Sequence, residues 1–561
     1  MSDKIVMGIS TGHTRGSAIT INGELAVAIS NERLTRIKTD HSDELPKQAM
    51  EYCIDALGIT YKDIDLFVYN ITEPVNKVII DFKNFTGVSL SKLKFIPHHI
   101  AHAYSTFAAS GFDEAAVVVA DAMGSVYDDT TPIKEWYNLD ESTLTNGQKW
   151  AEGFSIYQFK KGDINPHPVY KKWIKFPFDV ESGGSIGYFY GMGAKQLVYN
   201  PETHSWQAGK LMGLASYAEP EFVDKHDVLS IKGDNFLHVP SKPIMEDKVD
   251  WRSDFQFKAN VAGLYQREQE LNSMHLVKMA KKMTGSNNVC VSGGSFLNCN
   301  TNEMIIRSGL FENQYFMPPA DDSGIPHGCA FAGSAYLMDE IRTGDWMTPY
   351  TGKTYTDEEI ELDVAQFEGL RLVKLPKEVK YNLAAEMLDN NKVIGWFQNG
   401  SETGPRALGN RSMLASPKSP WMVNYINSEI KRREWYRPFA PSVLYDKQGE
   451  IFDLDTYSPY MLVTTTVKEE WKNKIPSVVH HDGTSRYQSV TPENNEEYYN
   501  VINKFYEKSG LPVVLNTSFN GPDEPIVETP FDAVRSMLNH DLFALFINDY
   551  MVVRLDQDGT L

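Results

Sequence analysis

The chain has 561 residues, too many for one hydrophobic core, so we expect two or three domains. Hydrophobic residues make up 42% and charged residues 23% of it, as in ordinary globular proteins. The formal net charge of −20 argues against broad electrostatic binding to nucleic acid or to an anionic membrane, although it leaves room for a local basic channel.

The four cysteines form no C-x-x-C pair, so the sequence signals neither a zinc ribbon nor a redox dithiol, and we expect buried, reduced thiols. The first residues lack the apolar segment of a signal peptide. No stretch approaches the roughly 20 apolar residues that span a bilayer. These features predict a cytoplasmic protein that is not bound to a membrane.

The chain is expected to open with a strand, a loop and a hairpin. Residues 5–9 have the pattern of a buried strand. The turn Asn22-Gly23 lies between the β-rich runs 17–21 and 24–29, and Asn-Gly in that setting is the strongest short hairpin signal.

Helices and buried strands then alternate along the front part of the chain. Helical periodicity marks residues 49–57 and 261–283, and short apolar runs mark strands at 115–120 and 289–291. Because strands that alternate with helices build layered sheets, the fold class predicted here is α/β.

A domain boundary is expected within residues 343–356, which carry glycine and proline without any periodicity. We therefore divide the chain into residues 1–345 and 346–561. In the second part we expect a helix at 383–388, a strand at 393–397, and a strand at 513–515 that ends on Asn516.

Two histidines at helical spacing are candidate metal ligands. His98 and His102 are four residues apart, which on a helix places both imidazoles on one face. Asp121 follows the strand predicted at 115–120, and a buried carboxylate there needs a partner such as a metal ion; Asp322 is a further candidate. Such a donor set suits Fe²⁺ or another divalent ion, including Mg²⁺ or Mn²⁺. Spacing alone slightly favours the alternative that the pair only packs a helix.

Several motifs have the composition of anion-binding loops. Ser292-Gly293-Gly294-Ser295 follows a buried strand and could present N–H groups to phosphate or ribose, although Gly-Gly at this place is more often a plain turn. Arginine forks match phosphate geometry. The C-terminal clusters therefore suggest one convergent anion pocket, against the alternative of separate solvated arginines. These motifs are residues 404–412, 431–439, 482–486 and 516–520.

At these motifs the sequence resembles the NodU/CmcH carbamoyltransferases, whose members modify antibiotics, tobramycin among them, and nodulation factors. The front-half motifs match in the same order, so the resemblance spans nearly the whole chain. It implies an N-terminal domain of the actin/hexokinase-like ATPase fold, similar to the tRNA threonylcarbamoylation protein, with carbamoyl transfer at a metal. It also implies a C-terminal YrdC-like α/β domain that forms carbamoyl adenylate.

The resemblance implies an ATP-dependent O-carbamoyltransferase. The C-terminal domain would make carbamoyl adenylate from carbamoyl phosphate and ATP, with release of pyrophosphate. The N-terminal domain would then transfer the carbamoyl group to an acceptor hydroxyl. Carbamate is a poor electrophile because its nitrogen donates into the carbonyl, so adenylation supplies a leaving group, and a metal with cationic side chains stabilises the developing charge.

Matching positions imply roles for individual residues. His13 would be the base for the acceptor, since imidazole titrates near neutral pH. The metal ligands would be His98, His102, Asp121 and Asp322. The residues that hold the adenylate would be Lys38, Lys210, Gly293, Gly294, Ser295 and Asn298. The residues that hold carbamoyl phosphate and ATP would be Arg406, Lys431, Arg437, Arg486, Asn516 and Ser518.

Three motifs depart from the family pattern. The family's His-Asp-x-Ser-Ala becomes His13-Thr14-Arg15-Gly16-Ser17-Ala18, with the acidic residue lost and the spacing one residue longer. Gly-Glu-x-Lys becomes Gln207-Ala208-Gly209-Lys210, and Asp-Gly-x-Gly becomes Asp121-Ala122-Met123-Gly124. These changes predict a different acceptor pocket with the same activation chemistry.

The acceptor has two interpretations: a small-molecule hydroxyl, such as a sugar of a natural product, or a hydroxymethylated pyrimidine, free or in DNA. The net charge weighs against DNA, but a basic, aromatic stretch at residues 160–175 could line a nucleic-acid groove. A non-catalytic nucleotide-binding protein is a third hypothesis, against which the intact arginine and histidine motifs argue. A monomer and a homodimer are both compatible with the sequence.

Overall fold

The structure is a computed structural model that describes residues 3–42, 44–71, 76–127, 149–176, 184–199, 207–225, 254–344 and 348–555. The chain divides into two compact units, each described by itself. Unit 1 comprises Met1–Thr35 and Thr39–Met347, and unit 2 comprises Arg36–Lys38 and Thr348–Leu561. Within the described ranges, no helix is both long and apolar enough to cross a membrane.

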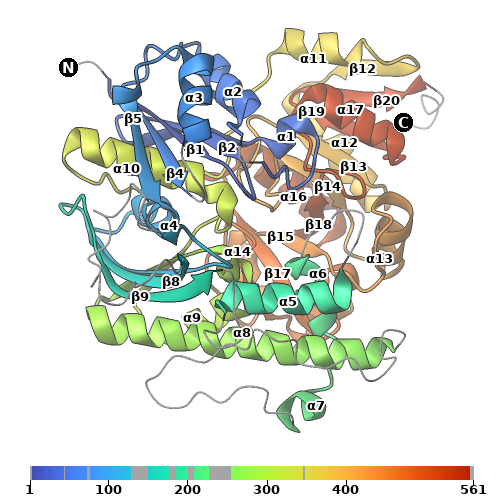
Figure 1. The fold of residues 1–561 in the computed structure, drawn as a ribbon. Coiled ribbons are helices and arrows are strands. Elements are labelled where there is room, and N and C mark those ends of the chain that lie inside the picture. Colours follow the sequence, from blue (N-terminus) through green and yellow to red (C-terminus); the bar gives the residue numbers. More distant parts are fainter. Residues whose placement is uncertain are drawn as a thin grey trace. The chain divides into compact units, whose positions relative to one another are not determined.

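The first sheet of unit 1 has the strand order β3-β2-β1-β4-β5 (Figure 1). β1 pairs antiparallel with β2 and parallel with β4. The predicted hairpin joins β2 to β3, and both of its turn residues have positive φ, 52° at Asn22 and 82° at Gly23, as the tight hairpin turn requires. The strands are β1 Ile5–Ser10, β2 Gly16–Ile21, β3 Glu24–Ser30, β4 Leu66–Ile71 and β5 Leu93–Pro97.

The second sheet of unit 1 has the order β11-β10-β6-β8-β7, and β9 pairs with β8. β6 runs parallel to β10 and antiparallel to β8. The long β8–β9 hairpin is absent from the sequence-based prediction and adds an antiparallel edge. The strands are β6 Glu114–Ala120, β7 Val126–Tyr127, β8 Lys149–Lys160, β9 Pro168–Phe176, β10 Asn288–Ser292 and β11 Asn313–Phe316.

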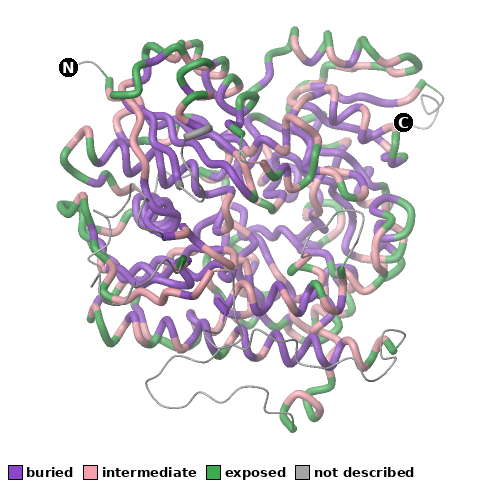
Figure 2. Tube along the Cα trace, in the orientation of Figure 1, coloured by how far each residue is buried: buried purple, intermediate pink, exposed green. Residues whose placement is uncertain are grey.

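Two buried helices lie between the sheets of unit 1. α4 (His98–Ala108) and α10 (Ile325–Met338) share one core with residues of both sheets, for example Val68 of β4 and Val117 of β6. Every residue of α4 is buried, and its trace is purple throughout (Figure 2). Because α4 is enclosed on both faces, the side chains on its first turn have fixed surroundings.

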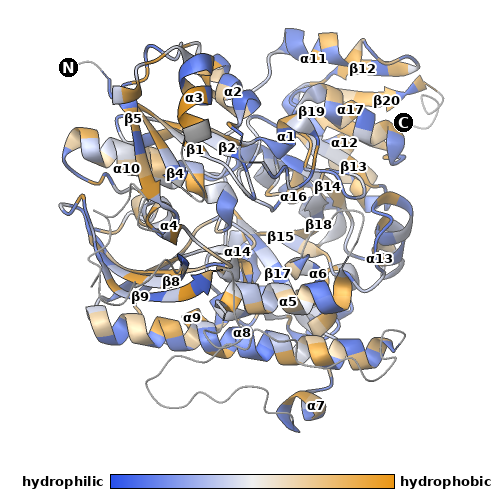
Figure 3. Ribbon diagram, viewed as in Figure 1, coloured by the Kyte–Doolittle hydropathy of each residue, from blue (hydrophilic) through white to orange (hydrophobic). Residues whose placement is uncertain are grey.

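The outer faces of both sheets are covered by amphipathic helices. α2 (Lys47–Leu57) and α3 (Asn76–Thr86) pack on the first sheet, and α8 (Phe255–Thr284) with α9 (Cys299–Arg307) on the second. Polar and apolar residues alternate along α8 (Figure 3). The remaining helices of unit 1 are α1 Glu32–Thr35, α5 Ile186–Val198, α6 Ala208–Ala215 and α7 Pro220–Lys225.

Unit 2 contains one mixed sheet of order β12-β20-β19-β13-β14-β18-β15-β17-β16. Its strands are β12 Leu370–Lys374, β13 Ile394–Phe397, β14 Arg411–Ala415, β15 Ala440–Leu444, β16 Val463–Thr466, β17 Thr484–Val490, β18 Val513–Ser518, β19 Ala544–Ile547 and β20 Tyr550–Arg554. Its helices are α11 Asp357–Val364, α12 Lys377–Asp389, α13 Trp421–Tyr425, α14 Tyr445–Ile451, α15 Glu469–Lys472, α16 Glu496–Ser509 and α17 Pro530–Asn539.

The predicted α/β class is confirmed, because both units combine mixed sheets with packed helices. One predicted strand end is wrong. β18 does not stop at Asn516 but continues to Ser518, since Asn516 and Ser518 both pair with β14. Asn516 therefore lies inside the sheet, with a buried side chain, rather than in a loop.

Candidate functional site

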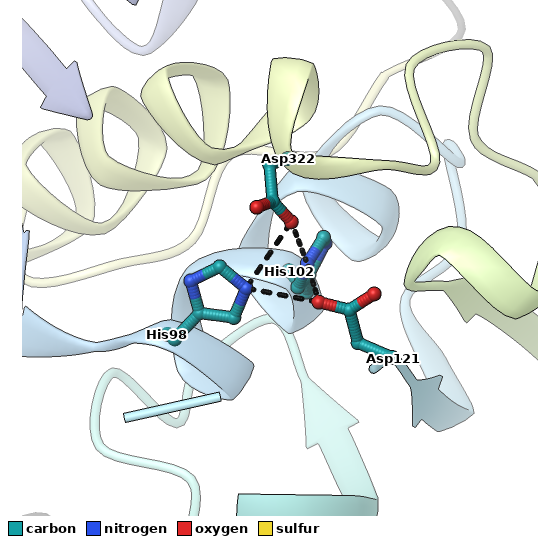
Figure 4. Close-up of side chains that lie close together, drawn as sticks. All are labelled: His98, His102, Asp121 and Asp322. Atoms are coloured by element: carbon teal, nitrogen blue, oxygen red, sulfur yellow. Dashed lines mark hydrogen bonds and ion pairs between the residues drawn. The ribbon is translucent and has the colours of Figure 1, made fainter. Parts of the chain in front are cut away.

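Four side chains of unit 1 converge on one point (Figure 4). His98 and His102 project from the first turns of α4, Asp121 follows β6, and Asp322 begins the 3-10 helix Asp322–Gly324. The Nε2 atom of His98 lies 3.2 Å from Asp121 Oδ2 and 3.4 Å from Asp322 Oδ1. One ligand atom from each of the four residues lies within 4.8 Å of the others. The sequence-predicted ligand set is thus brought together.

The donor set fits a divalent cation. Two imidazole nitrogens and two carboxylate oxygens suit Fe²⁺ or a similar ion. The Nε2 atom of His102 is buried and makes no hydrogen bond to any described residue, although it lies 3.6 Å from Asp322 Oδ1 and 3.8 Å from Asp121 Oδ2. A bound cation would give this buried nitrogen a partner.

Polar side chains beside the Nδ1 atoms orient the rings of His98 and His102. Asn70 Nδ2 lies 3.2 Å from His98 Nδ1, and Ser292 Oγ lies 3.1 Å from His102 Nδ1, so each Nε2 is turned toward the carboxylates. Asp121 Oδ1 accepts a hydrogen bond of 3.1 Å from Gly294 N, which leaves Oδ2 facing the histidines. Such partners hold ligands in position.

The carboxylates dominate the electrostatics of this cluster. Burial lowers the pKa of His98, but Asp322 and Asp121 more than offset it and raise the pKa to about 10. Burial and the charge of Asp121 raise the pKa of Asp322, but the histidines outweigh them and bring it to about 2. The histidines also hold the pKa of Asp121 well below its ordinary value against the effect of burial, so both aspartates stay in the charged form that binds a cation.

The glycine loop after β10 approaches the same cluster. Gly293 has φ 96°, and a Cβ there would lie 2.2 Å from the Ala120 carbonyl oxygen, so only glycine fits. Gly293 N donates to Ala320 O at 2.7 Å, which ties the loop to the segment that leads to Asp322. The Oγ atom of Ser295 is buried and makes no hydrogen bond among the described residues.

Buried amides on α8 anchor this loop, and the sequence-based prediction missed them. Gln266 and Asn298 exchange hydrogen bonds of 2.9 and 3.0 Å through their side-chain amides. Gln269 Nε2 donates to Ser295 O at 3.0 Å. Asn298 also caps α9, so its side chain holds the loop in shape. In sequence, these glutamines look like an ordinary polar helix face.

Lys210, predicted to join this loop in holding the adenylate, lies half-buried in the first turn of α6.

His13 lies exposed on the loop between β1 and β2. Its Nδ1 atom is 3.4 Å from Thr14 Oγ1, and its ring lies edge-on to that of His41 with centroids 6.4 Å apart. In the same loop, Arg15 Nη2 donates to Asp40 Oδ1 at 2.6 Å. His41 is therefore a neighbour that the motif comparison did not reveal.

Unit 2 gathers buried cations around a distorted turn. The π-helix Ile426–Ile430 leads into Lys431, and Arg432 follows with φ 42°. Unusual backbone of this kind is frequent at functional sites. Lys431 Nζ donates to Asn520 Oδ1 at 2.7 Å and to Asn520 O at 3.0 Å. Burial lowers the pKa of Lys431 far below its ordinary value, and the charges of Arg433, Lys38 and Arg437 lower it further.

The neighbouring arginines Arg433 and Arg437 are half-buried. Loss of solvation and the charge of Arg437 lower the pKa of Arg433, and loss of solvation and the charge of Arg486 lower the pKa of Arg437. Arg433, which the prediction did not select, donates to Asn427 Oδ1 at 2.7 Å and lies over the Phe439 ring. The Nε atom of Arg486 is buried and makes no hydrogen bond among the described residues. Lys38 is grouped with this unit, in the segment Arg36–Lys38.

The two arginines of the 404–412 motif have different surroundings. Arg406 is half-buried, whereas Arg411 is fully buried, lies over the Phe397 ring and donates to the carbonyl oxygens of Gln398 and Asn399 at 2.9 and 3.1 Å. The contacts of Arg411 are those of a structural clamp.

Asn516 and Ser518 lie on β18. Asn516 Nδ2 donates to Ala407 O at 3.1 Å, which supports the Arg406 loop, whereas its Oδ1 is buried without a hydrogen bond to a described residue. Ser518 Oγ donates to Asn520 Oδ1 at 2.6 Å and lies 3.4 Å from Lys431 Nζ. Among the predicted anion ligands, Ser518 and Lys431 are therefore in direct contact.

The basic stretch at residues 160–175 does not form a continuous basic surface. Lys171 is buried against Glu152, and its side chain is only 6% exposed. Lys160 and Lys161 each have an acidic neighbour, Glu114 at 3.9 Å and Asp113 at 4.0 Å. The nucleic-acid groove considered from the sequence therefore has no support in this geometry.

Comparison with known proteins identifies the family. The family model for the carbamoyltransferase N-terminus matches residues 5–81 and 74–331, and the model for the carbamoyltransferase C-terminus matches residues 385–554. The nodulation protein NolNO of Sinorhizobium fredii is 29% identical over 577 residues, 96% of this chain and 79% of the relative. The nodulation protein NolO of Bradyrhizobium diazoefficiens is 31% identical over 468 residues, 81% of this chain and 78% of the relative.

The chain therefore belongs to the carbamoyltransferase family, and the predicted resemblance is confirmed. It is a carbamoyltransferase enzyme. Among solved structures, HypF of T. kodakarensis aligns with 60% of this chain and 48% of its own at 13% identity, with a TM-score of 0.36. That score is too low to carry a conclusion about fold or function.

Proposed function

We propose that this carbamoyltransferase is ATP-dependent: it forms carbamoyl adenylate in unit 2 and transfers the carbamoyl group to a small-molecule hydroxyl at the His98 site of unit 1. The family supplies carbamoyl transfer. The observation that carries the ATP-dependent step is a cluster of cations in which Lys431 is buried and Arg433 and Arg437 are half-buried. The two arginines lie close enough to lower the pKa of Lys431. Cations that repel one another and are partly withdrawn from water would be stabilised by a bound anion such as a polyphosphate.

Two buried polar atoms of unit 2 that make no hydrogen bond among the described residues would suit groups of ATP and carbamoyl phosphate. The buried Nε–H of Arg486 is a donor suited to a phosphate oxygen, and the buried Oδ1 of Asn516 is an acceptor suited to a carbamoyl amide. Arg406, Arg437 and Ser518 would complete the phosphate contacts. In the balanced reaction, carbamoyl phosphate gives carbamate and phosphate by hydrolysis, and the carbamate oxygen then displaces pyrophosphate from the α-phosphorus of ATP.

In unit 1, the acceptor oxygen would attack the carbamoyl carbon and AMP would leave. A divalent ion held by His98, His102, Asp121 and Asp322 would supply Lewis-acid stabilisation of the developing negative charge. His13 would take the acceptor proton, and its exposed position makes it accessible to a diffusing hydroxyl compound. Lys210, Ser295 and the N–H groups of Gly293 and Gly294 would hold the adenylate.

The proposal is tested by product analysis. The protein is incubated with ATP, carbamoyl phosphate, Fe²⁺ and a panel of sugars, natural-product hydroxyls and hydroxymethylated nucleosides, and products are read by mass spectrometry. We expect an O-carbamoylated acceptor, with one AMP, one pyrophosphate and one phosphate formed per transfer. Release of ADP instead of AMP and pyrophosphate would overturn the adenylate route.

A further inference from the structure

Glu152 on β8 is a buried carboxylate that belongs to no predicted motif. Its side chain is 0% exposed. Its Oε2 atom accepts hydrogen bonds from Ser125 N at 2.9 Å and from His99 N at 3.2 Å. Both donors are backbone N–H groups, so the bonds fix the course of the chain at two separate places.

Both places adjoin proposed metal ligands. His99 lies in the first turn of α4, where N–H groups lack helical acceptors, and it follows His98 directly. Ser125 lies on the loop that begins at Asp121, and its Oγ atom accepts a bond of 2.9 Å from His98 N. One carboxylate oxygen therefore links the helix turn that presents His98 to the loop that presents Asp121.

The packing at this junction leaves little room. A Cβ at Gly124 would lie 2.6 Å from both Glu152 Oε2 and His99 Cδ2, so a larger residue there would force one of these side chains to move. The backbone of Gly124 also donates to Glu152 O at 2.9 Å. The loop after Asp121 is thus held by both the side chain and the backbone of Glu152.

The other carboxylate oxygen pairs with a buried lysine. Glu152 Oε1 accepts from Lys171 Nζ, and the ammonium lies 5.2 Å from the Trp173 ring centroid and 5.8 Å from that of Tyr157. Removing one partner of a buried pair leaves an uncompensated charge. Variants of Glu152 are therefore informative only when Lys171 is neutralised as well.

We propose that Glu152 is a positioning residue of the metal site, and that its hydrogen bonds to His99 N and Ser125 N set the distance between His98 and Asp121. Lys171 serves as its counter-ion. The inference rests on the metal site proposed above. It assigns Glu152 no contact with the ion or with the substrates.

Two double variants isolate the hydrogen bonds. Both E152Q/K171M and E152M/K171M remove the charged pair and keep the side-chain volume, but only the glutamine retains an oxygen that accepts from the two N–H groups. Co²⁺ is titrated into each metal-free protein and followed by visible absorption. We expect the methionine variant to bind Co²⁺ about 10–100-fold more weakly than wild type with an altered spectrum, and the glutamine variant to stay within about tenfold.

A matched control separates positioning from stability. Glu497 of unit 2 forms a buried pair with Lys380 at 2.7 Å, remote from the metal ligands in sequence and assigned to the other unit. The double variant E497Q/K380M removes this charged pair in the same way, and it should lower the melting temperature and leave Co²⁺ affinity and spectrum unchanged. If E152M/K171M fails to fold, the glutamine variant alone decides, because a loss of more than about tenfold there overturns the proposal.

The outcomes distinguish this inference from the proposed function. Wild-type protein that binds no Co²⁺ overturns the metal site and the inference with it. Wild-type protein that binds Co²⁺, with both double variants binding equally well, overturns only the role of Glu152.

Discussion

The Nε2 atom of His98 lies 3.2 Å from the Oδ2 atom of Asp121, although the two residues come from a helix start and a strand end. The contact exists because α4 is enclosed between two sheets and β6 ends beside its first turn. Backbone geometry, rather than flexible side chains, therefore sets the spacing of this pair.

Loss of either ligand should abolish metal binding. H98A or D322A removes one of four donor groups, so we expect Co²⁺ affinity to fall by more than about 100-fold, measured by titration and by metal content after dialysis. H99Q is the control, because the His99 ring faces Ser155 Oγ at 2.8 Å rather than the carboxylates. An equal loss in H99Q would contradict this assignment.

The two arginines of one motif should separate activity from stability. R406A is expected to remove carbamoyl-phosphate-dependent ATP chemistry and to change the free energy of unfolding by less than about 1 kcal/mol. R411A leaves buried carbonyl oxygens without a hydrogen-bond donor. It should lower the free energy of unfolding, measured by urea denaturation, by about 3 kcal/mol or more. If R406A proves the more destabilising of the two, the structural role assigned to Arg411 is wrong.

The buried ammonium group of Lys380 should make a large contribution to the free energy of unfolding. Lys380 Nζ is 0% exposed and bonds to Glu497, Asp549, Gln398 and the Asn548 carbonyl. K380M should therefore lower the free energy of unfolding by about 3–5 kcal/mol. K374M is the matched control, since Lys374 pairs with Asp357 while 58% exposed, and its effect on the free energy of unfolding should be far smaller. Equal costs would refute the argument.

His327 on α10 should make unit 1 acid-sensitive. The residue is 1% exposed, and burial lowers its pKa from 6.5 to about 4 against a weaker opposing effect of the Ser323 backbone. Between those two values the unfolded histidine binds a proton that the folded one does not, so stability is lost as pH falls from 6.5 toward 4. H327Q should remove this loss of stability, which totals at most about 3 kcal/mol over the range, as measured in denaturation curves at several pH values. An unchanged slope would contradict burial of the neutral ring.

Sequence periodicity and motif order predicted much of unit 1. The hairpin, α2, α8 and the pair His98/His102 follow from local signals that survive in the structure. Glu152 and Lys171 could not be found this way, because they lie on a long hairpin and meet α4 only through tertiary packing. Gln266 and Gln269 on α8 were also missed, because they contact the glycine loop only through tertiary packing.

In unit 2, the sequence located the cationic motifs but not the state of each side chain. Arg406 and Arg411 stand in one motif, and only the sheet determines that the second is enclosed. Asn516 was expected beyond a strand end and lies within β18, because pairing with β14 extends the strand to Ser518. Register across a sheet is a non-local property that a buried apolar run does not encode.

The central claim is that activation and transfer occur at separate sites, and ATP–pyrophosphate exchange without any acceptor tests it most directly. We predict carbamoyl-phosphate-dependent exchange in wild type, loss of exchange in R437A, and normal exchange in H98A with no carbamoylated product when acceptor is added. Absence of exchange in wild type, or identical behaviour of the two variants, would contradict the claim.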